Sequence, residues 1–158
     1  MKRFGLLALL LLLGATPAMA KNVTATGIHK ESISVSTNFI TPGTEVVVTG
    51  SHFDETVGIY LAYCVLPQLG KLPTPCGGGV NKTGIGDASY WISSNPPPYG
   101  KGLAISYEPG GRFKQKLLIS KKIGSFDCRK VKCAITVRAD HLMASDRSYD
   151  IFIPVKLK

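Results

Sequence analysis

Glycine and proline cut the chain into short segments, and this feature restricts its fold more than any other. The sequence holds 17 glycines and 10 prolines among 158 residues. The segments between them are rich in β-branched and aromatic side chains, and several alternate polar and apolar residues, as half-buried strands do. Glutamate is scarce, and alanine is sparse beyond the first twenty residues, so long surface helices are not expected.

These segments predict seven or eight short strands joined by turns, and therefore an all-β antiparallel sandwich, with a small β-barrel as the alternative. Only Asp140–Asp146 is expected to form a helical turn. The expected strands are Ser32–Thr37, Thr44–Gly50, Val57–Cys64, Ser89–Ile92, Leu103–Tyr107, Arg112–Ser120, Cys133–Ala139 and Tyr149–Leu157.

Residues 1–20 are interpreted as a secretory signal peptide. Lys2 and Arg3 precede the ten apolar residues Phe4–Leu13, and Ala18-Met19-Ala20 fits a cleavage site. A run of this length is too short to span a bilayer, which takes about 20 residues. We therefore expect a secreted or cell-envelope protein without a transmembrane anchor, whose residues 21–158 form one domain.

Export gives a meaning to the four cysteines, Cys64, Cys76, Cys128 and Cys133. An even number of cysteines in an exported chain predicts disulfides. Three connectivities are open, of which local pairing (Cys64 with Cys76, and Cys128 with Cys133) is the simplest. The spacings do not match those of zinc sites, and no histidine lies beside either pair, so no metal site is expected.

The cysteine-bearing segments resemble those of neocarzinostatin-type apoproteins, which are secreted actinobacterial proteins. Thr44–Gly50, Ser51-His52-Phe53-Asp54 and Gly58–Cys64 are similar to the strand–turn–strand–cysteine pattern of that family, and Asp127–Cys133 is similar to its second cysteine pair. The resemblance implies an immunoglobulin-like sandwich with two local disulfides. It also implies binding of a small ligand.

Other features depart from the members of that family that carry enediyne antibiotics. Those carriers have a long aromatic hairpin before the second cysteine pair, whereas here only residues 121–126 separate the preceding strand from Asp127. The carriers place an aromatic residue two positions after the first cysteine, where this chain has Leu66. The carriers tend to be acidic, whereas this chain has a formal charge of +9. We therefore do not expect an enediyne chromophore.

An insertion at residues 77–102, rich in glycine, proline and aromatic residues, replaces that hairpin. Its stretch Trp91–Gly102, together with Arg138–His141, resembles a subgroup of cell-surface actinobacterial proteins with this sandwich, some of which resemble or are joined to haem-uptake modules. This resemblance makes haem the one candidate cofactor, and Tyr99 and His141 are its candidate axial ligands. Trp91 and Tyr99 are the candidate binding residues of this loop, because aromatic side chains bury much area at little entropic cost. In the alternative interpretation Trp91 belongs to the core and the prolines form a stiff connector.

Positive charge is concentrated in the second half of the chain. Residues 101–158 carry thirteen basic and five acidic side chains, whereas residues 21–100 are nearly neutral. Such a run attracts polyanions, although lysines also protect edge strands from aggregation. The candidate basic contacts are Arg112, Lys114, Lys116, Lys121 and Lys122.

The sequence offers little for catalysis. His29, His52 and His141 lie on separate segments. Ser51 and His52 are expected to point to opposite faces of a strand, and no nucleophile-elbow, zinc-protease or P-loop motif is present. A secreted hydrolase is the least supported class.

The sequence thus predicts a non-catalytic exported binding module that contacts an envelope polymer or surface protein through its basic face and aromatic loop. Export argues against nucleic acid as its partner. The alternative hypothesis is a carrier of haem or another small apolar ligand.

Overall fold

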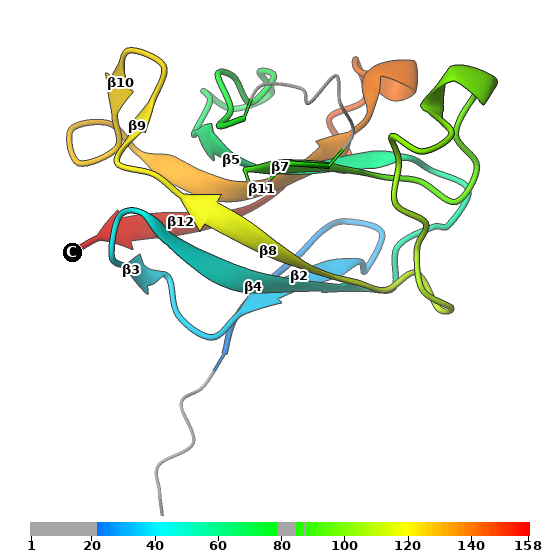
Figure 1. Cartoon of the computed structure of the whole chain (residues 1–158), viewed down its shortest axis with the longest axis horizontal. Coiled ribbons are helices and arrows are strands. Elements are labelled where there is room, and N and C mark those ends of the chain that lie inside the picture. Colours follow the sequence, from blue (N-terminus) through cyan, green and yellow to red (C-terminus); the bar gives the residue numbers. More distant parts are fainter. Residues whose placement is uncertain (1–21, 79–84, 87) are drawn as a thin grey trace, which may run out of the picture.

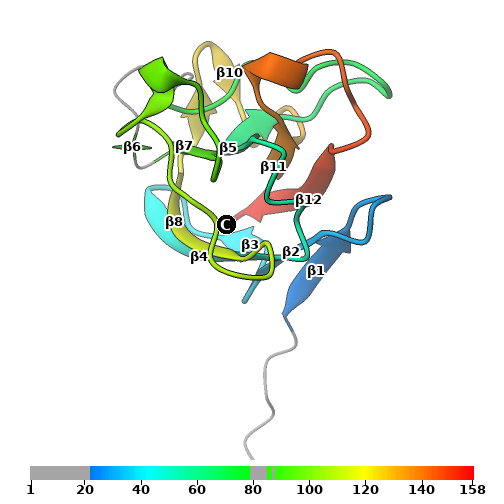
Figure 2. The same ribbon diagram turned by 90° about the vertical axis from the view of Figure 1, so that its right-hand side faces the viewer.

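A computed structural model describes residues 22–78, 85, 86 and 88–158. The expected signal peptide and part of the 77–102 insertion lie outside these residues. Two twisted sheets pack face to face, one above the other in Figure 1 and as two layers in Figure 2. The predicted all-β, immunoglobulin-like sandwich is confirmed.

The first sheet has four antiparallel strands, in the order β1-β2-β4-β8. They are β1 (Val23–Thr26), β2 (Ser32–Val35), β4 (Thr44–Ser51) and β8 (Phe113–Ile119).

The second sheet has six strands, in the order β3-β12-β11-β5-β7-β6, and only its β3–β12 pair is parallel. They are β3 (Phe39–Ile40), β12 (Ile151–Leu157), β11 (Cys133–Ala139), β5 (Ile59–Val65), β7 (Ser89–Ile92) and β6 (Ile85–Gly86). Connections contain the ribbon of β9 (Lys122–Ile123) and β10 (Phe126–Asp127) and the 3-10 turns η1 (Pro98–Gly100) and η2 (His141–Met143).

The core fills the space between the sheets and follows the period of two along each strand. On β5, Ile59, Leu61 and Tyr63 belong to the core, so Tyr60 and Ala62 point to the outer face of the six-stranded sheet. Tyr60 and Ala62 are nevertheless buried. Connecting segments therefore cover part of this outer face, and the candidate site lies there.

Both predicted disulfides are formed, Cys64–Cys76 and Cys128–Cys133. The first ties the loop after β5 to the end of that strand. The second closes the short connection between β10 and β11. Within the described ranges no free cysteine remains, and no helix is long and apolar enough to cross a membrane.

Most of the predicted strands are confirmed within one or two residues, but Leu103–Tyr107 is not a strand. Only Ile105 pairs there, through an isolated parallel bridge with Ile92. Gly102 has a left-handed φ of 79°, and Pro109 follows closely, so the segment between the two turns is too short for a longer ladder. Sequence reasoning also missed β1, β3, β6 and the β9–β10 ribbon, which are short.

Candidate functional site

The outer face of the six-stranded sheet carries a row of large side chains, three from successive strands and one from the residue just before β12. The register pairs Trp91 of β7 with Tyr60 of β5, and Tyr60 with Arg138 of β11. Val137 pairs with Ile151, so the next position of the row, opposite Arg138, is Asp150. Strand pairing alone therefore brings four chemically distinct groups side by side.

One end of this row is an aromatic cluster built around His141. The hydroxyl of Tyr60 lies 2.6 Å from Nδ1 of His141, and the hydroxyl of Tyr99 lies 2.7 Å from Nε2. The Trp91 ring meets His141 edge-on, with ring centroids 5.0 Å apart, and stacks with Tyr99 at 6.4 Å. Figures 1 and 2 show η1 and η2, which supply Tyr99 and His141, together on the outer side of the sheet.

Asp140 fastens this cluster to the sheet. Its carboxylate accepts a 2.9 Å hydrogen bond from Nε1 of Trp91 and another of 2.9 Å from the backbone N–H of Leu142. The side chain is 1% exposed. It lies so close to Gly58 that a Cβ there would stand 2.0 Å from Oδ2. This position needs glycine because of the close approach of the carboxylate.

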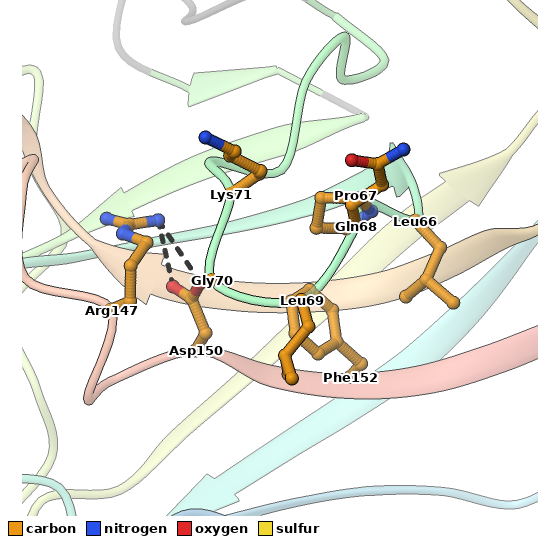
Figure 3. A pocket seen from close by; sticks show the side chains of 9 residues that line it. All are labelled: Leu66, Pro67, Gln68, Leu69, Gly70, Lys71, Arg147, Asp150 and Phe152. Atoms are coloured by element: carbon orange, nitrogen blue, oxygen red, sulfur yellow. Dashed lines mark hydrogen bonds and ion pairs between the residues drawn. The ribbon is translucent and has the colours of Figure 1, made fainter.

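The other end of the row borders a groove of about 430 Å³. Leu66, Pro67 and Leu69 of the loop after β5 form one wall, and Phe152 of β12 lies below them (Figure 3). Phe152 points outward because its neighbours Ile151 and Ile153 belong to the core. The groove is thus mainly apolar, which is the usual character of small-ligand sites.

Arg147 and Asp150 close one end of the groove (Figure 3). Nη1 of Arg147 donates to Oδ1 of Asp150 at 3.0 Å and to Oδ2 at 3.2 Å. Burial raises the pKa of Asp150 to about 6, although Arg147 and Arg138 oppose this shift. The guanidinium of Arg138 lies over the Tyr60 ring, 5.3 Å from its centroid. Burial, and then the charge of Arg147, lower the pKa of Arg138.

The two predicted aromatic contacts differ in exposure. Trp91 lies in β7 and is 8% exposed, whereas Tyr99 in η1 is 61% exposed. Trp91 is buried on the outer face of the sheet rather than between the sheets. Tyr90 and Tyr107, which lie near it in sequence, face the core instead. Whether Trp91 and Tyr99 contact a ligand remains a prediction.

The five predicted basic contacts are spread along the molecule. Lys114 and Lys116 are exposed on one face of β8, as period two predicts, and Lys116 lies 3.7 Å from Glu45. Arg112 precedes β8, whereas Lys121 and Lys122 lie beyond its far end, where Lys122 begins β9 of the β9–β10 ribbon (Figure 1). A strand of seven residues, about 23 Å long, separates Arg112 from this pair. Lys121 and Lys122 instead share their end of the molecule with the 128–133 loop and the C-terminus (Figure 1).

The side chain of His52 does not point where the sequence predicted. His52 has a left-handed φ of 63°, and this turn brings its Nδ1 within 3.1 Å of Oγ of Ser51, so the prediction that the two side chains diverge is wrong. Ser51 also bonds Ser32, at 3.0 Å. No carboxylate bonds His52 within the described residues, so the pair lacks the orienting acid of a catalytic triad. In the same part of the chain no group of three potential metal ligands is placed to hold an ion.

Sequence reasoning missed the groove and its charged end. Arg147, Asp150, Phe152 and Tyr60 were not singled out, and neither was the loop at 66–71. One signal was available, since a phase of two along Tyr149–Leu157 makes Phe152 an apolar residue on an outward face. Nothing in the sequence predicted that the disulfide-closed loop folds over that residue.

Comparison with known proteins supports the fold. No family model and no curated protein matches the sequence. A solved structure of macromomycin is similar, with a TM-score of 0.50 and 11% sequence identity, over 81% of this chain and 99% of macromomycin. Macromomycin is a protein of the neocarzinostatin family, so the predicted resemblance is confirmed for the sandwich. At this identity the likeness establishes a shared fold.

Proposed function

We propose that this chain is a non-catalytic binding module that holds a small, largely apolar ligand in the groove between the 66–71 loop and Phe152. The observation that carries the proposal is the groove itself, about 430 Å³ in volume and lined mainly by apolar groups. Ligand sites in proteins are typically concave, apolar and of this size.

The wall of the groove is held in place before any ligand arrives. The Cys64–Cys76 disulfide closes the loop that contains Leu66–Lys71. The backbone N–H of Val65 donates to the carbonyl of Pro75 at 3.0 Å, and that of Leu66 donates to the carbonyl of Lys132 at 2.9 Å. A loop fixed at its base loses little entropy on binding, which favours affinity.

The test is a titration with N-phenyl-1-naphthylamine, a neutral apolar dye whose fluorescence rises in apolar surroundings. We expect saturable binding to the wild type. Leu69→Ser should weaken it about five- to ten-fold, because Leu69 is fully exposed at the rim and loses its contact with the dye.

Val47→Ser is the matched control, since Val47 is an exposed apolar residue of β4, in the four-stranded sheet, whereas Phe152 of the groove belongs to the six-stranded sheet. It should leave the affinity unchanged. Absence of saturable binding, or equal effects of the two substitutions, would contradict the proposal.

A second candidate function is contact with an anionic envelope polymer. It is favoured by the exposed cations at the end of the molecule that carries the β9–β10 ribbon, namely Lys121, Lys122, Arg129, Lys130, Lys132, Lys156 and Lys158. Binding to isolated cell wall should then weaken steeply as the Debye length falls to about 8 Å near 0.15 M salt. Lys121→Gln with Lys122→Gln should reduce it more than Lys114→Gln with Lys116→Gln. Salt-independent binding would exclude this function.

A role in haem binding has less support. Tyr99 and His141, its candidate ligands, are hydrogen-bonded to each other, and His141 is also bonded to Tyr60. Iron coordination by His141 would have to break one of these bonds, because both of its ring nitrogens are engaged. Visible absorbance of the protein isolated from its host would test this role, and recovery of the protein from the culture medium would test secretion.

A further inference from the structure

We propose that Arg147, which closes one end of the groove, and Arg138, which lies near it behind the groove lining, form an anion-binding subsite, so that the ligand carries one compact oxyanion beside its flat apolar body. This inference rests on the proposed function, because it names the chemical class of the ligand for the same groove. It comes from the residues of this chain and from the charges around them.

The two arginines reach the same place from different segments. Arg138 lies on the outer face of β11, opposite the position of Asp150 in the strand register. Arg147 lies in the segment before β12 and pairs with that same aspartate. Asp150 is therefore flanked by two guanidinium groups, and both act on it electrostatically.

Arg147 is held in place, yet one of its donors is left over. Its Nη1 binds Asp150, and its Nη2 donates to the carbonyl of Ala144 at 2.7 Å. Its Nε–H is buried and has no hydrogen-bond partner within the described residues. A buried donor without a partner is costly, and a charged oxygen acceptor would relieve that cost.

Arg138 adds a second cation that no carboxylate pairs directly. It is half-buried over the Tyr60 ring and makes no hydrogen bond or ion pair within the part of the chain that the structure describes. Burial lowers the pKa of Arg138, and the positive charge of Arg147, which repels that of Arg138, lowers this pKa further. Arg138 and Arg147 bear two positive charges beside the Asp150 carboxylate, and the second carboxylate nearby, Asp146, acts on Asp150 more weakly than either arginine. The positive charge that Asp150 leaves over is partly buried, and a bound anion would neutralise it.

The apolar part of the groove begins at the right distance from this charge. Phe152 is the second residue of β12 and Asp150 is the residue just before that strand, so the two are two positions apart, which corresponds to about 7 Å in an extended chain. That is about the length of a two-ring aromatic system. A flat body between Leu69 and Phe152 can therefore place an oxyanion at the arginines.

The aspartate competes with this anion for Arg147. The charged groups around Asp150 are Arg138 from β11, Arg147 and Asp146 from the segment before β12, and Lys71 on the loop across the groove. Protonation of Asp150 removes the competing charge and frees Nη1 of Arg147. Anion affinity should therefore increase as the pH falls through about 6.

The experiment compares two dyes that differ by one charged group: neutral N-phenyl-1-naphthylamine and its sulfonate, 8-anilinonaphthalene-1-sulfonate. In the wild type at low salt the sulfonate should bind about ten-fold more tightly, as a charge-assisted hydrogen bond allows. Arg138→Gln and Arg147→Gln should each remove most of this difference, while the neutral dye binds within about two-fold of the wild type.

Lys71→Gln is the matched control, because Lys71 is another cation that lines the groove, but it belongs to the loop across from Asp150 and is not a member of the Arg147–Asp150 ion pair (Figure 3). It should leave the preference for the sulfonate intact. At neutral pH, Asp150→Asn should bind the sulfonate dye as tightly as the wild type does at about pH 5. The affinity of this variant for the sulfonate should not depend on pH. Arg138→Gln leaves the Arg147–Asp150 pair untouched, so it remains informative if Arg147→Gln fails to fold.

The outcomes separate the two proposals. If the neutral dye binds and the sulfonate shows no preference, or if Lys71→Gln acts like the arginine variants, the anion subsite is wrong and the proposed function stands. If the sulfonate binds through the arginines and the neutral dye does not bind, the apolar groove is wrong and the anion subsite stands. If neither dye binds, both proposals fail.

Discussion

Replacing Trp91 by alanine should destabilise the protein by about 3–5 kcal/mol. The indole is 8% exposed even though it points away from the core between the sheets. Its ring meets His141 and Tyr99, and Gly100 comes so close that a Cβ there would lie 2.5 Å from Cη2. The stability of the 93–104 segment therefore depends on this side chain.

The magnitude follows from two losses. Burial of a large aromatic side chain removes about 150–250 Å² from water, which at about 25 cal/mol per Å² corresponds to about 4–6 kcal/mol. The substitution also removes the hydrogen bond from Nε1 to the buried Asp140, and an unsatisfied buried acceptor costs about 1–3 kcal/mol. The methyl group of alanine remains buried, and the surface segment can collapse into the vacated space. Both effects offset part of the two losses, so the net destabilisation is about 3–5 kcal/mol.

Denaturant unfolding followed by circular dichroism measures the effect, and the thermal midpoint should fall by about 10 °C. Tyr99→Ala is the control. Tyr99 is 61% exposed and should cost less than about 1 kcal/mol. Trp91 is the only tryptophan of the chain, so its emission should shift to longer wavelength on unfolding. A loss below about 1 kcal/mol for Trp91→Ala would refute the packing argument and would make the indole available as a loop contact.

Three further predictions concern stability. Gly58→Ala should be strongly destabilising because its Cβ would stand 2.0 Å from the Asp140 carboxylate. Gly77→Ala should cost little stability, because the nearest atom to its Cβ would lie 3.4 Å away. Equal thermal midpoints for the two variants would contradict this reasoning. Replacing Cys64 and Cys76 by serine should lower the unfolding free energy more than replacing Cys128 and Cys133, because the sequence separations are 12 and 5 residues and a longer closed loop restricts the unfolded chain more; the reverse order in denaturant midpoints would show that packing dominates. The pKa of Asp150 is raised from 3.8 to about 6, so the neutral carboxyl favours the folded state and stability is lost as the pH rises through about 6. The thermal midpoint of Asp150→Asn relative to the wild type should therefore be higher at neutral pH than at about pH 5, and a difference independent of pH would count against the burial of this carboxyl.

Local pattern was enough to predict the fold class. The alternation along Cys133–Ala139 reproduces β11, and the β-branched run at Thr44–Gly50 reproduces β4 within one residue. Period two also predicted that Lys114 and Lys116 would be exposed on β8. Each of these follows from neighbours in sequence, because a strand with one buried face must alternate.

Short elements were not predictable in the same way. The bonds of β3 depend on β12, which lies more than 100 residues further along the chain, and two residues carry no periodic signal. The segment at Leu103–Tyr107 has strand-like composition, yet its pairing is limited to Ile105 because of the turns on either side. At His52 the left-handed backbone turns the side chain toward Ser51, whereas the two side chains were expected to point to opposite faces of a strand.

The sequence by itself determined the all-β class and the inward and outward phases of the long strands, because turn chemistry and side-chain alternation act over a few residues. It left three disulfide connectivities open, of which the structure forms the local one. Only the tertiary structure decided that Trp91, Tyr60, Arg138 and Asp150 form one row, that Tyr99 and His141 meet above it, and that Leu69 and Phe152 line a common groove. These groups come from neighbouring strands of the sheet and from the segments that connect them, and they are distant in the chain. Their proximity depends on strand order and register, which arise from the packing of the whole sandwich rather than from any one segment.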